Sequence, residues 1–311
     1  MNGNGTEIRQ LSTRDIALVV LCAASFGSSF LFIDIVVKEV PPVTLACARS
    51  IISFFTLSLV LWLGGHRLPG PGRIWAALFV LGMATQVVPM ILLSWGQIHI
   101  DSGLAGIILG TVPVLTMVFA HLLFHDERMS TRSLAGAAVG FAGVVFVIGR
   151  GVLNDIEVHM LADLALLAAA TSIASANVLA RKSGHLAPIV LAVGSQGAAV
   201  VALVPLSVVV DQPWSLDVSW SSVAALVVLG TVGSALPGLI FYKLLARVGA
   251  TRASLVAYLV PVVAVVLGAV FLAERLPWEA LAGMALIVLG AWLVNQRRRP
   301  ASDPPAQWLE P

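Results

Sequence analysis

A small set of polar and aromatic side chains lies inside the long apolar segments of this 311-residue chain. These residue types could bind a ligand, because a pocket for a zwitterionic or neutral metabolite needs a few directed hydrogen-bonding groups among aromatic walls. The expected ligand contacts are Trp95, Gln86, Tyr258, Asn177, Tyr242 and Ser28. Hydrogen bonding between helices, or aromatic anchoring near a membrane interface, is the alternative role for these side chains.

Charged side chains form a second group of candidates. Arg49 lies well inside an apolar segment, where an unpaired charge is expensive, so it should face the protein interior, a watery mouth or a partner acid. Asp34 is the expected partner, and Arg49 either attracts a substrate carboxylate or forms a structural ion pair. Glu127 and Glu274 stand at the ends of apolar segments, where an acid opposes the helix dipole. They could close gates at opposite membrane faces, or simply be solvated helix ends.

Catalytic and metal-binding patterns are weak in this sequence. It contains no His-Glu-x-x-His pattern, no paired aspartates within a span and no serine in a nucleophile elbow, so we expect no enzyme. His121 and His125 are one helical turn apart, but no further ligands converge with them, and packing is favoured over a metal site. We therefore expect neither a metal nor another cofactor.

Four prolines interrupt the apolar segments at matched positions. Proline removes a helical hydrogen bond and frees a carbonyl, so each could kink a helix and let it bend during transport, with a fixed kink as the alternative. Adding 148 to the residue number carries Pro89 onto Pro237 and Pro113 onto Pro261. The prolines are therefore part of a repeat.

The repeat extends over most of the chain. The same offset carries Val112 onto Val260, and an offset of 147 carries Glu127 onto Glu274. We divide the chain into an N-terminal cytoplasmic segment (1–14), a first repeat (15–150), a linker (151–159), a second repeat (160–296) and a disordered cytoplasmic tail (297–311).

Composition places the chain in a bilayer, because 59% of its residues are hydrophobic and only 11% are charged. At about 20 apolar residues per span, the sequence predicts about ten transmembrane segments. Backbone groups in hydrocarbon must bond within their own segment, so we expect helices and an all-α fold. The expected spans are residues 16–37, 43–63, 74–98, 103–124, 134–148, 161–179, 188–210, 223–245, 253–272 and 280–294.

Loop charges predict the orientation of these spans. Most of the 18 basic residues fall in loops on one side, together with both termini, and the positive-inside rule makes that side cytoplasmic. Five helices per half is an odd number, so the second half must cross the membrane in the opposite direction. Inverted repeats recur in secondary transporters, since two such halves can rock about a central site and expose it to alternate sides.

These features resemble the EamA-type members of the drug/metabolite transporter superfamily, which carry two copies of a five-helix unit. The residues carrying the resemblance are Phe26-Gly27-Ser28-Ser29-Phe30, Pro42, Arg49, Pro113 through Glu127-Arg128, and Pro261 through Glu274-Arg275. Phe26 departs from the tryptophan that the family often has there. The resemblance implies export of small metabolites, frequently amino acids, through a cavity lined by the first, third, fourth, sixth, eighth and ninth helices.

We therefore expect a multi-pass transporter of the inner (plasma) membrane that works by alternating access. Its expected partners are a small-molecule substrate, such as an amino acid, and the lipid bilayer. The net charge of +2 and the scattered basic residues argue against nucleic acid. Glycines at 136, 140, 143, 283 and 290 favour packing within the chain over association, so we expect a monomer or a weak homodimer. A flippase of a lipid-linked sugar or other amphiphile on the same fold is the alternative function.

Overall fold

The computed structural model describes residues 12–70, 72–123, 131–149, 156–182, 186–248 and 255–295, and it contains no strand within them. Seven helical segments in these ranges are long and apolar enough to cross a membrane, and three shorter apolar helices accompany them. Large apolar side chains cover the outside of the bundle, among them Trp62, Val209 and Trp220, which are all more than two-thirds exposed. The all-α membrane fold predicted from the sequence is confirmed.

The first half contains five spans, two of them interrupted. Its elements are α1 (Thr13–Val37), α2 (Pro42–Leu63), α3 (Ile74–Gly82), the π-helical turn η1 (Met83–Val87), α4 (Val88–Gly96), α5 (Ser102–Leu109), α6 (Val112–Leu123) and α7 (Thr131–Gly149). The third span is thus α3, η1 and α4, and the fourth is α5 and α6.

The second half repeats this order. Its elements are α8 (Ile156–Lys182), α9 (Pro188–Val210), the short 3₁₀ helix η3 (Pro213–Ser215), α10 (Trp220–Gly230), the π-helical turn η4 (Thr231–Ala235), α11 (Leu236–Val248), α13 (Leu255–Phe271) and α14 (Trp278–Asn295). The fifth and tenth helices are longer than predicted, with 19 and 18 residues.

Local sequence explains several helix ends. Ser12 and Asp15 form a reciprocal capping box at the start of α1. α2 and α9 begin with Pro42 and Pro188, a position where the missing N–H is not needed. Gly64 follows the last residue of α2, and its N–H bonds to the carbonyl of Val60.

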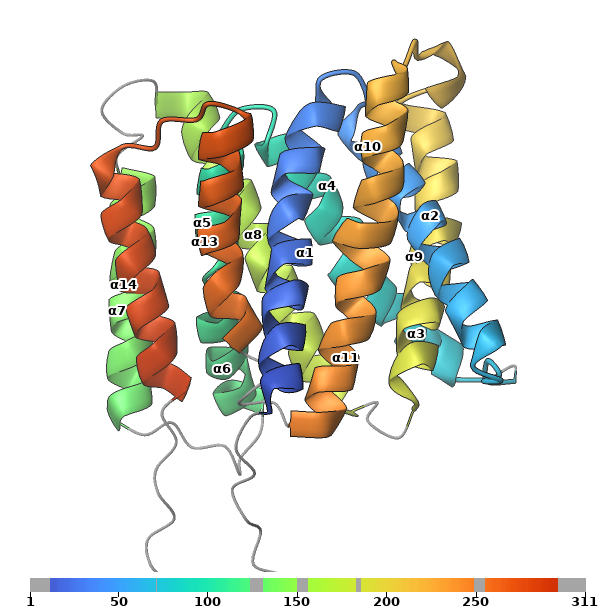
Figure 1. Cartoon of the computed structure of the whole chain (residues 1–311), viewed down its shortest axis with the longest axis horizontal. Helices are drawn as coiled ribbons and strands as arrows, with labels where there is room; N and C mark the ends of the chain where they lie inside the picture. Colours follow the sequence, from blue (N-terminus) through green and yellow to red (C-terminus); the bar gives the residue numbers. More distant parts are fainter. Residues whose placement is uncertain are drawn as a thin grey trace, which may run out of the picture.

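The helices form two layers flanked by two pairs (Figure 1). The front layer in this view consists of α13, α1 and the α10–α11 span, with α1 packed on both of the others, and the back layer consists of α4, α5, α6 and α8. The pair α7–α14 lies at one side and the pair α2–α9 at the other. We call the face where α1 ends the outer face, since the loop charges predict it to be external.

Candidate functional site

The third span of each half is broken at the same position by a π-helical turn. η1 and η4 are separated by the repeat offset of 148, and Pro89 and Pro237 are the second residues of the helices that follow. In η1 the N–H of Val88 donates to the carbonyl of Met83, five residues back. The next donor in this pattern would be Pro89, which has no N–H, so the carbonyl of Ala84 loses its helical partner.

Side chains from the opposite half donate to one backbone carbonyl in each π-helical turn. Ser172 of α8 donates its hydroxyl to the carbonyl of Ala84 at 2.9 Å. In the other half, Ser29 of α1 donates to the carbonyl of Gly233 at 2.7 Å. The first helix of each half is therefore hydrogen-bonded to the broken third span of the other half, and a carbonyl left without a donor inside a membrane span would be costly.

Arg49 takes part in the second of these breaks. Its guanidinium donates through Nε to the hydroxyl of Ser234 and through Nη2 to the carbonyl of Gly233, at 3.3 Å. The residue is only 5% exposed, and its Nη1 is buried with no hydrogen-bond partner. Gln196, its counterpart at the repeat offset of 147, is also buried and donates to the hydroxyl of Ser53 at 3.0 Å.

The predicted pairing of Asp34 with Arg49 is wrong. Asp34 instead forms an ion pair with Lys38 at 2.7 Å, one turn along α1. Residues four apart on a helix lie on the same face, so Lys38 is in reach without any tertiary rearrangement. Arg49 is left with neutral partners, and none of the ion pairs among the described residues includes it.

The remaining two prolines differ from each other in their setting. Between α5 and α6 the fourth span is interrupted at Gly110 and Thr111, and Pro113 lies in the first turn of α6. Pro261 instead lies inside the continuous helix α13. The hydroxyl of Thr111 bonds back to the carbonyl of Ile108 at 2.7 Å, which helps to end α5 there.

The predicted ligand contacts are spread along the bundle. Asn177, near the inner end of α8, donates to the hydroxyl of Thr116 on α6 at 3.4 Å. Trp95 lies near the outer end of α4, where its ring meets that of His99 edge to face at 4.9 Å. Gln86 lies half-buried in η1. Tyr242 and Tyr258 lie on α11 and α13, but their side chains, like all of Glu127 and His125, are outside the described residues.

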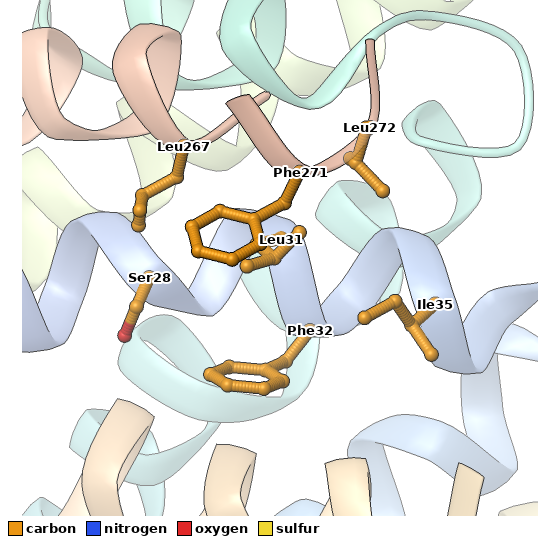
Figure 2. Close-up of a pocket in the computed structure, with 7 residues that line it drawn as sticks. All are labelled: Ser28, Leu31, Phe32, Ile35, Leu267, Phe271 and Leu272. Carbon is orange, nitrogen blue, oxygen red and sulfur yellow. The ribbon is translucent and has the colours of Figure 1, made fainter. Parts of the chain in front are cut away.

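Ser28 lines a groove between α1 and α13 (Figure 2). The groove has a volume of about 530 Å³, and every other side chain that lines it is apolar: Leu31, Phe32, Ile35, Leu267, Phe271 and Leu272. The hydroxyl of Ser28 already donates to the carbonyl of Ser25 at 2.9 Å. This groove therefore suits an apolar occupant.

Three acids at the outer face bind the N-termini of helices that are distant in sequence. Glu274 accepts hydrogen bonds from the backbone N–H groups of Ser102 and Gly103 at the start of α5, at 2.8 and 2.9 Å. Asp211 accepts the N–H of Thr44 in the first turn of α2 at 2.7 Å. Negative charge is favourable at this end of a helix, so the three contacts join the outer ends of the spans. The third acid, Glu39, binds the residue just before α10.

Glu39 accepts the N–H of Ser219, the residue before α10, at 2.9 Å. That backbone hydrogen bond, followed by those from the hydroxyls of Ser222 and Ser219, holds the pKa of Glu39 below its ordinary value. Sequence reasoning missed Glu39 and Asp211, because their partners are 180 and 167 residues away. It also missed Asp163, which is only 2% exposed on α8.

No group of three or more potential metal ligands occurs among the described residues. The breaks of the third spans instead gather serine hydroxyls, backbone carbonyls and one guanidinium. Such a set can exchange hydrogen bonds as helices bend, and it contains no nucleophile paired with a base.

Comparison with known proteins identifies relatives along nearly the whole chain. The model of the EamA-like transporter family matches residues 13–149 and 160–296. An uncharacterized transporter of Archaeoglobus fulgidus is 26% identical over 285 residues, which are 90% of this chain and 98% of the relative. A probable terminal-alkyne amino-acid exporter of Streptantibioticus cattleyicolor is 27% identical over 292 residues, with 92% and 96% covered.

Two further matches agree with these. The uncharacterized inner membrane transporter YedA of Escherichia coli strain K12 is 28% identical over 285 residues, covering 86% of this chain and 88% of the relative. A solved crystal structure superposes with a TM-score of 0.66 at 22% identity, covering 91% of this chain and 96% of the other. That likeness concerns the fold alone.

Proposed function

Because this chain belongs to the EamA-like transporter family and is therefore a multi-pass membrane transporter, we propose that it exports small metabolites, with amino acids as the main substrate class. Transport proceeds by alternating access between the two inverted halves. The name of the Streptantibioticus cattleyicolor relative supports the amino-acid class.

The observation that carries this proposal is the reciprocal bonding of the two third-span breaks. Ser29 and Ser172 each hold the π-helical turn of the opposite half. A π-helical turn followed by proline bends at low cost, since few backbone hydrogen bonds remain to be broken there. Two such hinges, related by the inverted repeat and each bonded to the other half, support a coupled rocking motion.

The substrate class also fits the polar groups near the hinges. An amino acid needs hydrogen-bond donors for its carboxylate and acceptors for its ammonium group. Gln86 of η1, Asn177 of α8 and Thr116 of α6 are half-buried and supply both kinds. We place the substrate between η1 and the inner part of α8, beside these three side chains.

The membrane location and orientation are part of the proposal. The inner membrane is supported by the name of the Escherichia coli relative. The basic loops support cytoplasmic termini. A monomer is supported by α7 and α14, whose glycines face each other within the chain: a Cβ on Gly290 would overlap the backbone of Gly136 and Gly140. That small-residue face is already used, so any dimer must use another surface.

The test is efflux from liposomes that contain the purified protein and are preloaded with radiolabelled amino acids, with and without a pH gradient. We expect efflux of one chemical group of amino acids above that of empty liposomes. Gln86→Ala and Asn177→Ala should lower the rate while the yield of folded protein is unchanged. Wild-type rates in both variants would contradict the placement of the substrate.

The groove of Figure 2 favours one alternative, the movement of an amphiphile across the bilayer. An apolar groove of about 530 Å³ between α1 and α13 could hold an acyl or polyprenyl chain while a head group moves through the bundle. Protection of a fluorescent short-chain lipid from external dithionite separates the two functions. Fast loss of protection without amino-acid efflux would establish the alternative.

A further inference from the structure

At the outer face, Glu274 connects the two layers of helices. It follows α13, which belongs to the front layer, and its carboxylate binds the N-terminus of α5, which belongs to the back layer. Each carboxylate oxygen accepts one backbone N–H, and charge-assisted bonds of this kind are among the strong ones. Asp101 stands at the N-cap position of α5, yet its side chain does not cap the helix, so Glu274 supplies the cap.

The local backbone is shaped to present this carboxylate. Ala273 has φ of +54°, a left-handed conformation that a residue with a Cβ rarely adopts. This turn brings Glu274 back over the end of α13, where its N–H bonds to the carbonyl of Gly268 at 3.2 Å. A Cβ on Gly268 would overlap the carboxylate, and one on Gly103 would lie 3.1 Å from Oε2. A strained residue and two glycines thus leave room for the contact.

The other two outer acids do not bridge the layers. Glu39 joins the end of α1 to the start of α10, both in the front layer, and Asp211 joins α9 to α2 within their flanking pair. One further hydrogen bond does cross between the layers at this face: Gln97, next after α4, donates to the carbonyl of Phe30 on α1 at 2.8 Å. Toward the inner face, neither α1 nor α11 packs extensively on α6 or α8 within the described residues. The layers are therefore joined at their outer ends.

We propose that Glu274 is the latch of an outer gate: it binds the N-terminus of α5 while the transporter is closed to the outside and releases it when the outer end opens. This inference rests on the proposed alternating access. Gln97 reinforces the closed gate from the neighbouring span. The substrate then enters from the inner face, as export requires, and the latch must break before the substrate leaves.

The experiment uses Ser102→Cys as a reporter of the gate, in a background of Cys22→Ala and Cys47→Ala. Ser102 is fully buried beneath the latch and its hydroxyl has no partner, so a thiol in its place breaks no hydrogen bond, and the backbone N–H that Glu274 binds is kept. The rate of labelling by a membrane-impermeant maleimide is measured in right-side-out and inside-out vesicles. With Glu274 present, we expect slow labelling from the outside.

Glu274→Gln should raise the external labelling rate about tenfold, which corresponds to ~1.4 kcal/mol. Glu279→Gln is the matched control, because it removes the same charge from the same face in the first turn of α14. It should leave the rate unchanged. Equal labelling rates in the Glu274→Gln and Glu279→Gln proteins would overturn the latch. So would a Glu274→Gln protein that is labelled faster from the inside than from the outside.

A second variant tests the latch without removing it, in case the Glu274→Gln protein folds poorly. Ala273→Gly lets the left-handed turn form without steric cost, so it should favour the latched state and slow external labelling. Faster or unchanged labelling would contradict the proposal. The assay needs no substrate. If the labelling rates follow these expectations but no amino acid is exported, the proposed substrate class fails while the latch stands. If amino acids are exported but the labelling rates do not change, the latch fails while the proposed function stands.

Discussion

Ser172 donates its hydroxyl to the carbonyl of Ala84 at 2.9 Å, and this carbonyl is the one that Pro89 deprives of a backbone partner. In the other half, Ser29 donates its hydroxyl to the carbonyl of Gly233, which lies in the π-helical turn before Pro237. The two contacts cross between the halves in opposite directions. They make the bend of each third span dependent on the first helix of the other half.

Ser172→Ala should destabilise the protein more than Ser29→Ala. The first substitution leaves the carbonyl of Ala84 without a donor, at a cost of about 1 to 3 kcal/mol for a buried group. The second leaves Gly233 with the Nη2 of Arg49, 3.3 Å away. Thermal unfolding in detergent measures the difference. Ser175→Ala is the control, since this hydroxyl bonds only to the carbonyl of Ser172 in its own helix. Equal unfolding temperatures for the two main variants would contradict the argument.

Pro89→Ala and Pro237→Ala should slow transport without loss of stability. Alanine restores an N–H that can pair with the freed carbonyl, and proline inside a helix costs about 3 kcal/mol relative to alanine. A more regular third span bends less readily, so the initial rate of efflux should fall several-fold. Pro42→Ala should change neither quantity, because the first position of α2 needs no N–H. Wild-type efflux from both hinge variants would show that the breaks are fixed kinks.

How far the sequence predicts these features depends on the range of the contacts. The offset of 148 predicts that Pro89 and Pro237 lie in equivalent places, because it needs only the printed residues. It does not predict the hydrogen bonds that hold the third spans to the opposite halves, since the donors Ser172 and Ser29 are 88 and 204 residues from their acceptors. The apolar spans are predicted well because their signal is local: the thickness of the bilayer sets the length of each apolar run.

In the candidate site, the contacts of Asp34 and Glu274 were not predicted from the sequence, for two different reasons. Lys38 stands four residues after Asp34, and this spacing alone places the two side chains on the same face of a helix. The prediction of Arg49 as the partner overlooked this local pair. The sequence suggests a gate role for Glu274, but it does not show the partners of this residue, which precede it by 172 and 171 residues. A single sequence contains no signal for such a pairing.

Arg49→Gln should fold at least as stably as the wild type and export more slowly. Glutamine keeps a donor for Ser234 or Gly233, as Gln196 does at the equivalent position, and it removes a buried charge that has no carboxylate partner among the described residues. A cation kept in a membrane span against that cost indicates a functional use. Unfolding temperature and efflux rate are measured together. A strong loss of stability, with normal specific activity in the protein that remains folded, would make Arg49 purely structural.

The contact between Glu39 and Ser219 should make stability depend on pH. Hydrogen bonding lowers the pKa of Glu39 in the folded protein, so its contribution is fully present above the ordinary value of about 4.3 and is lost as pH falls through the lowered value. Wild type should therefore unfold at a higher temperature than Glu39→Gln near neutral pH, and the two should converge as the pH falls through the lowered pKa. Glu279→Gln, which alters an acid in the first turn of its own helix α14, should not reproduce this convergence. A difference between wild type and Glu39→Gln that is constant over this range would show that the carboxylate charge does not stabilise the start of α10.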